Sequence, residues 1–152
     1  MIRVLFACVH NAGRSQMAAA FFNQLADPAL AHAISAGTEP AAQIHPEVLS
    51  VMREVGIELE GMTPRLLTTD LASQTNILVT MGCGESCPVV PGVKREDWNL
   101  PDPKGQPLER VRQIRDEIRK TVHEMVQANH WDGERGILNS DTTGESPRRP
   151  KS

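Results

Sequence analysis

A cysteine and an arginine stand six positions apart around a short loop that contains a glycine. The loop reads Cys8-Val-His-Asn-Ala-Gly-Arg14-Ser15, and it follows an apolar run at residues 2–7 that is typical of a buried parallel strand. Residues 15–22 have the composition of a helix. The backbone N–H groups of the loop are therefore expected to converge at a helix N-terminus, where they would bind a tetrahedral oxyanion.

The same loop supplies a nucleophile beside the anion. The helix dipole, the N–H groups and the Arg14 cation all favour the thiolate form of Cys8 over the neutral thiol. The Arg14 guanidinium is planar and permanently charged, so it can bind two oxygens of one anion. The residues that we expect to surround the oxyanion are Val9, His10, Asn11, Ala12, Gly13, Arg14 and Ser15.

Two polar residues of the loop each allow two interpretations. Ser15 either caps the helix N-terminus or donates a hydrogen bond to the thiolate, and its position alone does not separate the two. Asn11 is expected to have a structural role, either as a donor that locks the loop or as a residue that tolerates a left-handed backbone angle. His10 is expected to lie on the loop surface.

The rest of the chain alternates between strand and helix patterns. This alternation predicts a parallel sheet with active loops beyond the carboxyl ends of its strands. Residues 82–107 are rich in glycine and proline and are expected to form a loop. The alternating charges between residues 109 and 120 favour a solvated helix face. The remaining predicted elements are a strand at 31–35, a helix from 46 that stops at Gly56, a short helix from 68, a strand at 76–81 and a helix at 108–126.

Composition restricts the class of protein. A chain of 152 residues with 39% hydrophobic content supports one core, so we expect one domain over residues 1–130 and a disordered tail over residues 131–152. A net charge of −3 argues against a nucleic-acid surface. No segment has the length of a membrane span or the pattern of a signal peptide, which predicts a cytoplasmic protein whose three cysteines begin as thiols. We also expect a monomer.

With these motifs in place, the chain resembles the low-molecular-weight tyrosine phosphatase family, and within it the arsenate reductase branch. The resemblance rests on five separated motifs. They are the Cys-x5-Arg-Ser loop with Asn11, the segment Ser35-Ala36-Gly37-Thr38, Val79-Thr80-Met81 before a cysteine pair, Trp98, and Asp102-Pro103. It implies a three-layer α/β sandwich with a four-stranded parallel sheet, flanked by helices, and the anion loop after the first strand. It also implies Cys8 as nucleophile, Arg14 as oxyanion clamp, Ser15 as donor to the thiolate and Asp102 as general acid.

Two departures from the phosphatase pattern favour a reductase. The chain contains no tyrosine, and Asp102 is followed by Pro103-Lys104-Gly105 rather than by an aromatic pair. A cysteine pair, Cys83 and Cys87, follows a predicted strand; three residues separate the two cysteines, where the familiar three-cysteine reductases have six. The resemblance implies that Cys8 attacks arsenate, Cys83 attacks Cys8 with release of arsenite, and Cys87 attacks Cys83. Phosphate and sulfate would compete for the same loop.

The expected electron donor is an external thiol, with thioredoxin first. The alternative is a small thiol such as glutathione or mycothiol together with glutaredoxin. No bound cofactor and no metal are expected. Two further hypotheses are a low-molecular-weight tyrosine phosphatase, and a regulatory protein that traps arsenite with its three thiols.

Overall fold

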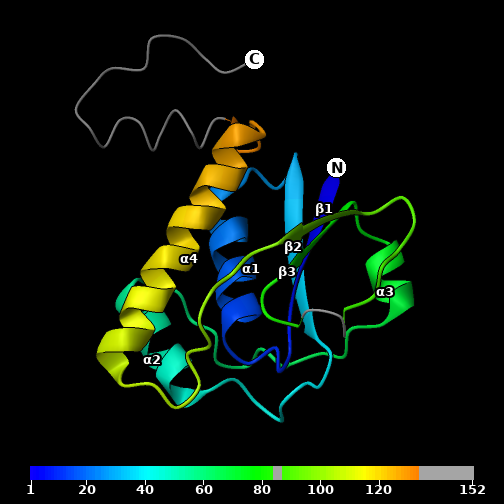
Figure 1. Ribbon diagram of the computed structural model, residues 1–152. Coiled ribbons are helices and arrows are strands. Elements are labelled where there is room, and N and C mark those ends of the chain that lie inside the picture. The colour runs from blue at the N-terminus through cyan, green and yellow to red at the C-terminus, as the bar shows by residue number, and fades with distance from the viewer. Residues whose placement is uncertain (84–86, 134–152) are drawn as a thin grey trace, which may run out of the picture.

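A computed structural model places four strands and four helices, and it describes residues 1–83 and 87–133 of the chain. Strand and helix alternate over the first half, as the sequence predicts, and the longest helix comes last (Figure 1). The elements are β1 (Ile2–Cys8), α1 (Arg14–Leu25), β2 (Ala31–Gly37), α2 (Pro46–Glu54), α3 (Thr69–Ser73), β3 (Ile77–Thr80), β4 (Lys94–Asp97) and α4 (Leu108–Ala128).

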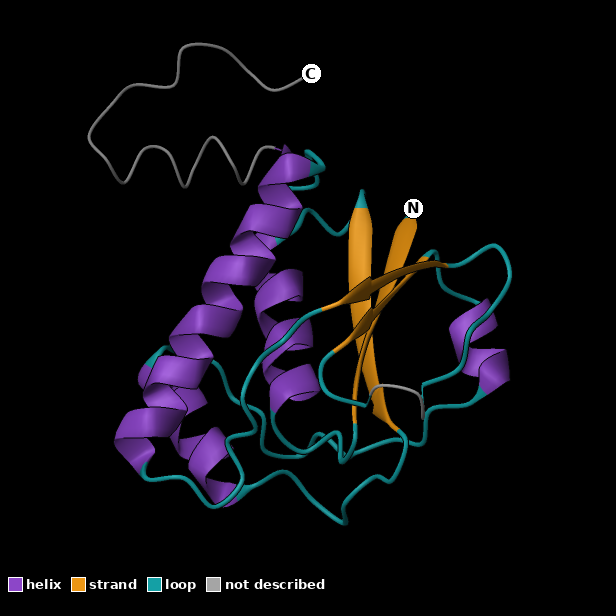
Figure 2. Ribbon diagram, in the orientation of Figure 1, coloured by secondary structure: helices purple, strands orange, loops and turns teal. Residues whose placement is uncertain are grey.

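The strands form one sheet in the order β2-β1-β3-β4, and every neighbouring pair is parallel (Figure 2). The predicted four-stranded parallel sheet flanked by helices is therefore confirmed. The first strand lies inside the sheet, with Cys8 opposite Gly37 at the end of β2. Because parallel strands share one carboxyl edge, the loops after β1, β2 and β3 meet there, and this edge carries the candidate site.

The alternation of side chains along β1 separates two cores. Val4, Phe6 and Cys8 belong to the larger core, which is packed with residues of α1, α2 and α4. Leu5 and Ala7 belong to a smaller core on the α3 side of the sheet. Figure 1 shows α1, α2 and α4 together on one side of the strands and α3 on the other, which gives the predicted three layers.

The fourth strand corrects the prediction for residues 82–107. The segment contains β4, whose sequence is Lys-Arg-Glu-Asp. All four residues are charged, so neither apolar alternation nor a buried apolar run marks this segment as a strand. The strand lies at the edge of the sheet and pairs with β3 alone, and charged residues are common on edge strands because they discourage further pairing.

The predicted stop and start signals around the second and third helices are confirmed. Gly56 adopts a positive φ of 81° directly after α2 and its C-cap. Thr68 caps α3, since its hydroxyl accepts a hydrogen bond from the backbone N–H of Leu71 at 3.0 Å. These signals fix where the chain turns back between β2 and β3.

One arginine of the last helix departs from the predicted solvated face. Arg115 is 8% exposed and donates to the carbonyl oxygen of Val51 and to the carboxylate of Glu54 on α2, both at 2.9 Å. Arg112 binds the same carboxylate at 2.8 Å. Hydrogen bonds from Arg112 and Arg115 hold the pKa of Glu54 below its ordinary value. The charge pattern of the helix does not predict this contact, because Glu54 lies about sixty positions away from Arg115 in the sequence.

Packing continues beyond the last helix. The Trp131 ring lies 5.8 Å from the Phe22 ring, and the backbone N–H of Asp27 donates to the Trp131 carbonyl oxygen at 2.8 Å. Of the tail predicted to be disordered, residues 134–152 lie outside the described residues. Within residues 1–83 and 87–133, no helix has the length and apolar content needed to span a bilayer.

We expect Phe6→Ala to destabilise the protein by about 3–5 kcal/mol, because it leaves a cavity in the larger core. The Phe6 ring is fully buried and lies 5.9 Å from Phe22 and 5.5 Å from Trp98. Urea unfolding measures the loss. Val89→Ala is the control, since Val89 is 83% exposed and its truncation should change the free energy of unfolding by less than about 0.5 kcal/mol. Equal losses in the two variants would contradict the packing described.

Candidate active site

The loop between β1 and α1 turns its carbonyl groups outward. Each carbonyl of residues 8–13 accepts a hydrogen bond from a donor outside the centre of the loop, at 2.8–3.2 Å. An oxyanion site requires carbonyl oxygens that are directed away from the anion, and these outward hydrogen bonds meet that requirement. The donors, in the order of the carbonyls from residue 8 to residue 13, are the backbone N–H groups of Thr38, Glu39 and Ala41, the side-chain Nε2 of Gln16, and the backbone N–H groups of His45 and Met17.

The segment after β2 makes this arrangement possible. Four of the six donors belong to residues 38–45, which run along the outside of the loop. Gly37, at the end of β2, admits the close approach: a Cβ built there would lie 2.6 Å from the Val9 carbonyl oxygen and 2.9 Å from the Asn11 nitrogen. The glycine in Ser35-Ala36-Gly37-Thr38 is thus required by the loop that crosses it.

A buried hydrogen-bond chain ends at the Cys8 sulfur. The backbone N–H of Arg65 donates to Asn11 Oδ1 at 2.9 Å, so the opposite atom of that amide, Nδ2, is the one that donates to Ser15 Oγ at 2.7 Å. Ser15 Oγ lies 2.9 Å from Cys8 Sγ. Because the Asn11 amide donates to Ser15 Oγ, the hydroxyl proton of Ser15 is free to point at the sulfur.

These contacts decide between the interpretations that the sequence left open. Gly13 occupies the N-cap position of α1, so the capping role for Ser15 is wrong and its hydroxyl contacts the sulfur instead. Asn11 has both suggested properties: a positive φ of 51° and the hydrogen bonds that lock the loop. His10 donates through Nδ1 to the carbonyl oxygen of Glu39 at 3.1 Å.

Arg14 is held at the first position of α1 by contacts with two other loops. Its guanidinium donates to the Leu100 carbonyl oxygen at 3.1 Å and is largely buried. It also packs directly on the backbone of Gly82, where a Cβ would collide with Nη1. Gly82, which has a positive φ of 108°, therefore leaves the space in which the guanidinium lies.

The loop that contains Asp102 approaches the loop between β1 and α1 through Pro103. A Cβ on Gly13 would lie 2.9 Å from Pro103 Cγ and 3.6 Å from His45 Cδ2, so both rings pack over this glycine. Beside Pro103, a carboxylate oxygen of Asp102 lies 3.7 Å from Arg14 Nη2, and the side chain is 46% exposed. Burial lowers the pKa of His45, partly offset by the charges of Glu47 and Asp102.

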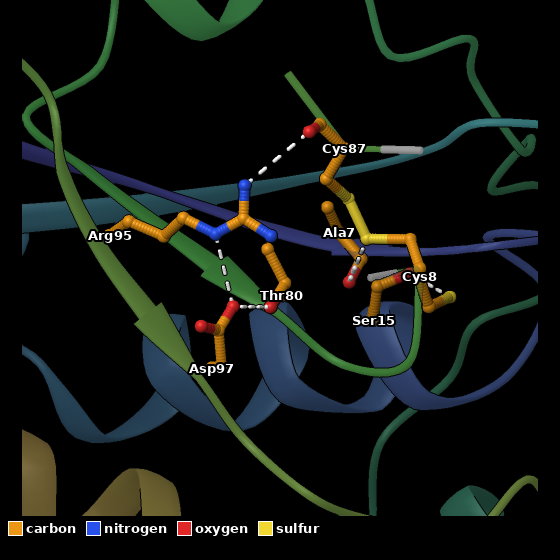
Figure 3. Close-up of a disulfide and its surroundings, with 8 residues drawn as sticks. Ala7, Cys8, Ser15, Thr80, Cys87, Arg95 and Asp97 are labelled. Carbon is orange, nitrogen blue, oxygen red and sulfur yellow. Dashed lines mark hydrogen bonds and ion pairs between the residues drawn. A yellow bond between two sulfur atoms is a disulfide. The ribbon is translucent and has the colours of Figure 1, made fainter. Parts of the chain in front are cut away.

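The cysteine pair Cys83 and Cys87 forms a disulfide in the smaller core. Cys83 and Cys87 are bridged with their Cα atoms 5.7 Å apart, and both are buried. Cys83 Sγ lies 3.9 Å from the carbonyl oxygen of Ala7, the residue directly before Cys8 (Figure 3). Cys8 is a free thiol on the opposite face of β1. The three separated cysteines of the sequence thus gather around the end of one strand.

A cleft of about 680 Å³ opens beside Cys87 and is lined in part by Gly82, Val89 and Trp98. Arg95 crosses its wall, donating from Nη1 to the Cys87 carbonyl oxygen at 3.3 Å and from Nε to Asp97 at 3.1 Å (Figure 3). Hydrogen bonds from the Thr80 hydroxyl and from Arg95 hold the pKa of Asp97 below its ordinary value. Among the described residues, no group of three or more histidine, cysteine or acidic side chains is arranged to hold a metal ion.

Four residues of the site carry no role in the sequence prediction. Two of them are glycines that leave room for a neighbouring segment, and the other two donate hydrogen bonds to oxygen atoms of Asn11. Only the motif around Gly37 hinted at one of them. The four are Gln16, Gly37, Arg65 and Gly82.

The fold and this loop define a class of protein. Residues 3–133 match the family described as low molecular weight phosphotyrosine protein phosphatase, and the chain belongs to that family.

Several proteins and solved structures similar to this chain are named arsenate reductases. A Halobacterium salinarum protein provisionally named an arsenate reductase is 42% identical over 123 residues, covering 77% of this chain and 85% of that protein. A glutaredoxin arsenate reductase of Synechocystis is 34% identical over 129 residues, covering 83% and 97%. The structure of the thioredoxin-dependent arsenate reductase of Corynebacterium glutamicum matches with a TM-score of 0.73 at 38% identity, over 84% of this chain and 61% of that one.

We expect Gly82→Ala to weaken the binding of inorganic phosphate about tenfold or more, measured by calorimetric titration. The new Cβ displaces the Arg14 guanidinium, and a lost hydrogen bond to a charged group is worth about 1.5–3 kcal/mol. Gly92→Ala is the matched control, because Gly92 also has a positive φ, 83°, but has no atom within 4 Å of its Cβ position. Equal phosphate affinity in the two variants would show that Arg14 tolerates the methyl group.

Proposed function

We propose that this protein reduces arsenate to arsenite with a thiol relay through Cys8, Cys83 and Cys87. The observation that carries the proposal is the juxtaposition of an oxyanion loop, which holds one free cysteine, with a disulfide on the other face of the same strand end. A phosphatase reaction uses the first of these features and has no use for the second. The relatives named above support the same assignment.

The first step uses the resemblance of arsenate to phosphate in shape and charge. The N–H groups of the loop and the Arg14 guanidinium bind the oxyanion oxygens. The Cys8 thiolate, stabilised by the Ser15 hydroxyl at 2.9 Å, attacks arsenic. We assign Asp102, whose carboxyl oxygen lies 3.7 Å from the guanidinium, as the general acid: in its protonated form it gives its proton to the departing oxygen, which leaves as water.

The second step transfers two electrons to arsenic. The Cys83 thiolate attacks Cys8 Sγ, an S–S bond forms as the S–As bond breaks, and the electron pair of the broken bond converts As(V) to As(III), which leaves as arsenite. Cys87 then attacks Cys83, which frees Cys8 and leaves a disulfide between Cys83 and Cys87. The bonding seen here, with Cys8 free and the pair bridged, is the pattern that this last exchange would leave.

The cycle closes when an external thiol reduces the Cys83–Cys87 disulfide. We assign thioredoxin as this donor. The second candidate is a small thiol acting with glutaredoxin, and the observation that favours it is the cleft of about 680 Å³ that Cys87 lines, a volume within the range of small-molecule sites. Both donor types occur in the names of the relatives.

The wild-type protein should oxidise NADPH in an arsenate-dependent manner when coupled to thioredoxin and thioredoxin reductase, or to glutaredoxin with glutathione. Cys8→Ser should reduce this rate to background, because a hydroxyl at position 8 can neither ionise near neutral pH nor donate electrons. Failure of the wild type with both donor systems, combined with turnover of an aryl phosphate that survives Cys83→Ser, would replace the reductase by a phosphatase.

A single turnover without reductant should leave a disulfide between Cys83 and Cys87, mapped by mass spectrometry on protein that was fully reduced beforehand. In Cys87→Ser the relay should stop one step earlier, with a Cys8–Cys83 disulfide and one equivalent of arsenite released. Release of arsenite without any protein disulfide, in the presence of a small thiol, would assign the second electron-donating thiol to that molecule instead.

A further inference from the structure

One side chain completes the outward hydrogen bonding of the anion loop. Five of the six loop carbonyls accept from backbone N–H groups, and the carbonyl of Asn11 accepts from the side chain of Gln16 at 3.1 Å. The same Nε2 atom lies 3.2 Å from Asn11 Oδ1. Gln16 is in the first turn of α1 and is 4% exposed, so water has little access to replace it.

Asn11 is the junction through which this contact reaches the nucleophile. The residue is fully buried and has a positive φ of 51°, a left-handed conformation that asparagine adopts more readily than most residues other than glycine. Its amide is oriented by donors to Oδ1, namely Arg65 N–H at 2.9 Å and Gln16 Nε2. This orientation turns Nδ2 toward Ser15 Oγ at 2.7 Å, and Ser15 Oγ in turn lies 2.9 Å from Cys8 Sγ.

We infer that Gln16 is a positioning residue for the Cys8 thiolate, acting through Asn11 and Ser15. The inference rests on the proposed function in one respect, that Cys8 is the nucleophile. Without the Gln16 amide, the buried carbonyl of Asn11 loses its donor and the Asn11 side chain loses one of the two groups that orient it. The Asn11 amide then holds the Ser15 hydroxyl less firmly. As a result, the hydroxyl proton points at the Cys8 sulfur for a smaller fraction of the time.

The experiment uses two variants of nearly equal size and one matched control. Gln16→Met keeps the length of the side chain but has no donor, and Gln16→Glu replaces the donor by a carboxylate that repels the Asn11 oxygens. Gln24→Met makes the same chemical change at an exposed position of the same helix. All three are made with Cys83→Ser and Cys87→Ser, so that Cys8 is the only thiol.

The readout is the rate of alkylation of Cys8 by iodoacetamide between pH 4 and pH 10 (chosen to span roughly the range in which thiols ionise). Gln16→Met should move the profile to higher pH and lower the rate at neutral pH about tenfold, as expected for the loss of one hydrogen bond in a chain that ends on a charge. Gln16→Glu should move it further in the same direction, and Gln24→Met should leave it in place.

Urea unfolding of each variant separates positioning from folding. A loss of stability in Gln16→Met with an unchanged alkylation profile would assign Gln16 a purely structural role and overturn the inference, as would a Gln16→Glu profile equal to that of the parent protein. Because alkylation needs no arsenate, this result is independent of the reductase assay. A shifted profile in these variants, together with failure of the wild-type protein to reduce arsenate with either donor system, would sink the proposed function and leave the inference standing.

Discussion

The carbonyl oxygens of residues 8–13 all accept hydrogen bonds from groups outside the centre of the loop, and much of this fold serves that arrangement. The segment after β2 supplies four of the six outward donors, and it can run close to the loop because Gly37 has no side chain in the way. The parallel pairing of β1 with β2 brings the two segments to the same edge of the sheet. The helix dipole and Arg14 then act on a loop whose polarity is already set.

The end of β1 is also where two cores with different contents meet. Cys8 faces the core of the long helices, whereas Cys83 and Cys87 are packed in the smaller core behind Ala7. A relay between them must therefore pass around the end of the strand rather than through the sheet. Gly82 and Cys83 are suited to this place, because the first contacts Arg14 and the second contacts the carbonyl oxygen before Cys8.

The sequence predicts what is local and misses what depends on distant contacts. The strand, loop and helix around Cys8 were predictable because the apolar run, the glycine-containing loop and the helix-forming residues follow one another directly in the sequence. The strand β4 was not, since its charged residues pair with β3 only at the sheet edge. The role of Gln16 was also hidden: a glutamine in a first helical turn is ordinary, and only the left-handed backbone of Asn11 brings a buried carbonyl within its reach.

The contact between Pro103 and Gly13 ties the evolution of two loops together. A methyl group at position 13 would lie 2.9 Å from the Pro103 ring, and that ring belongs to the residue beside the carboxylate of Asp102. A larger residue at 13 therefore needs a smaller or displaced one at 103. Because residues in contact couple, we expect substitutions at positions 13 and 103 to be non-additive, so that the effect of a change in one loop depends on the residue in the other.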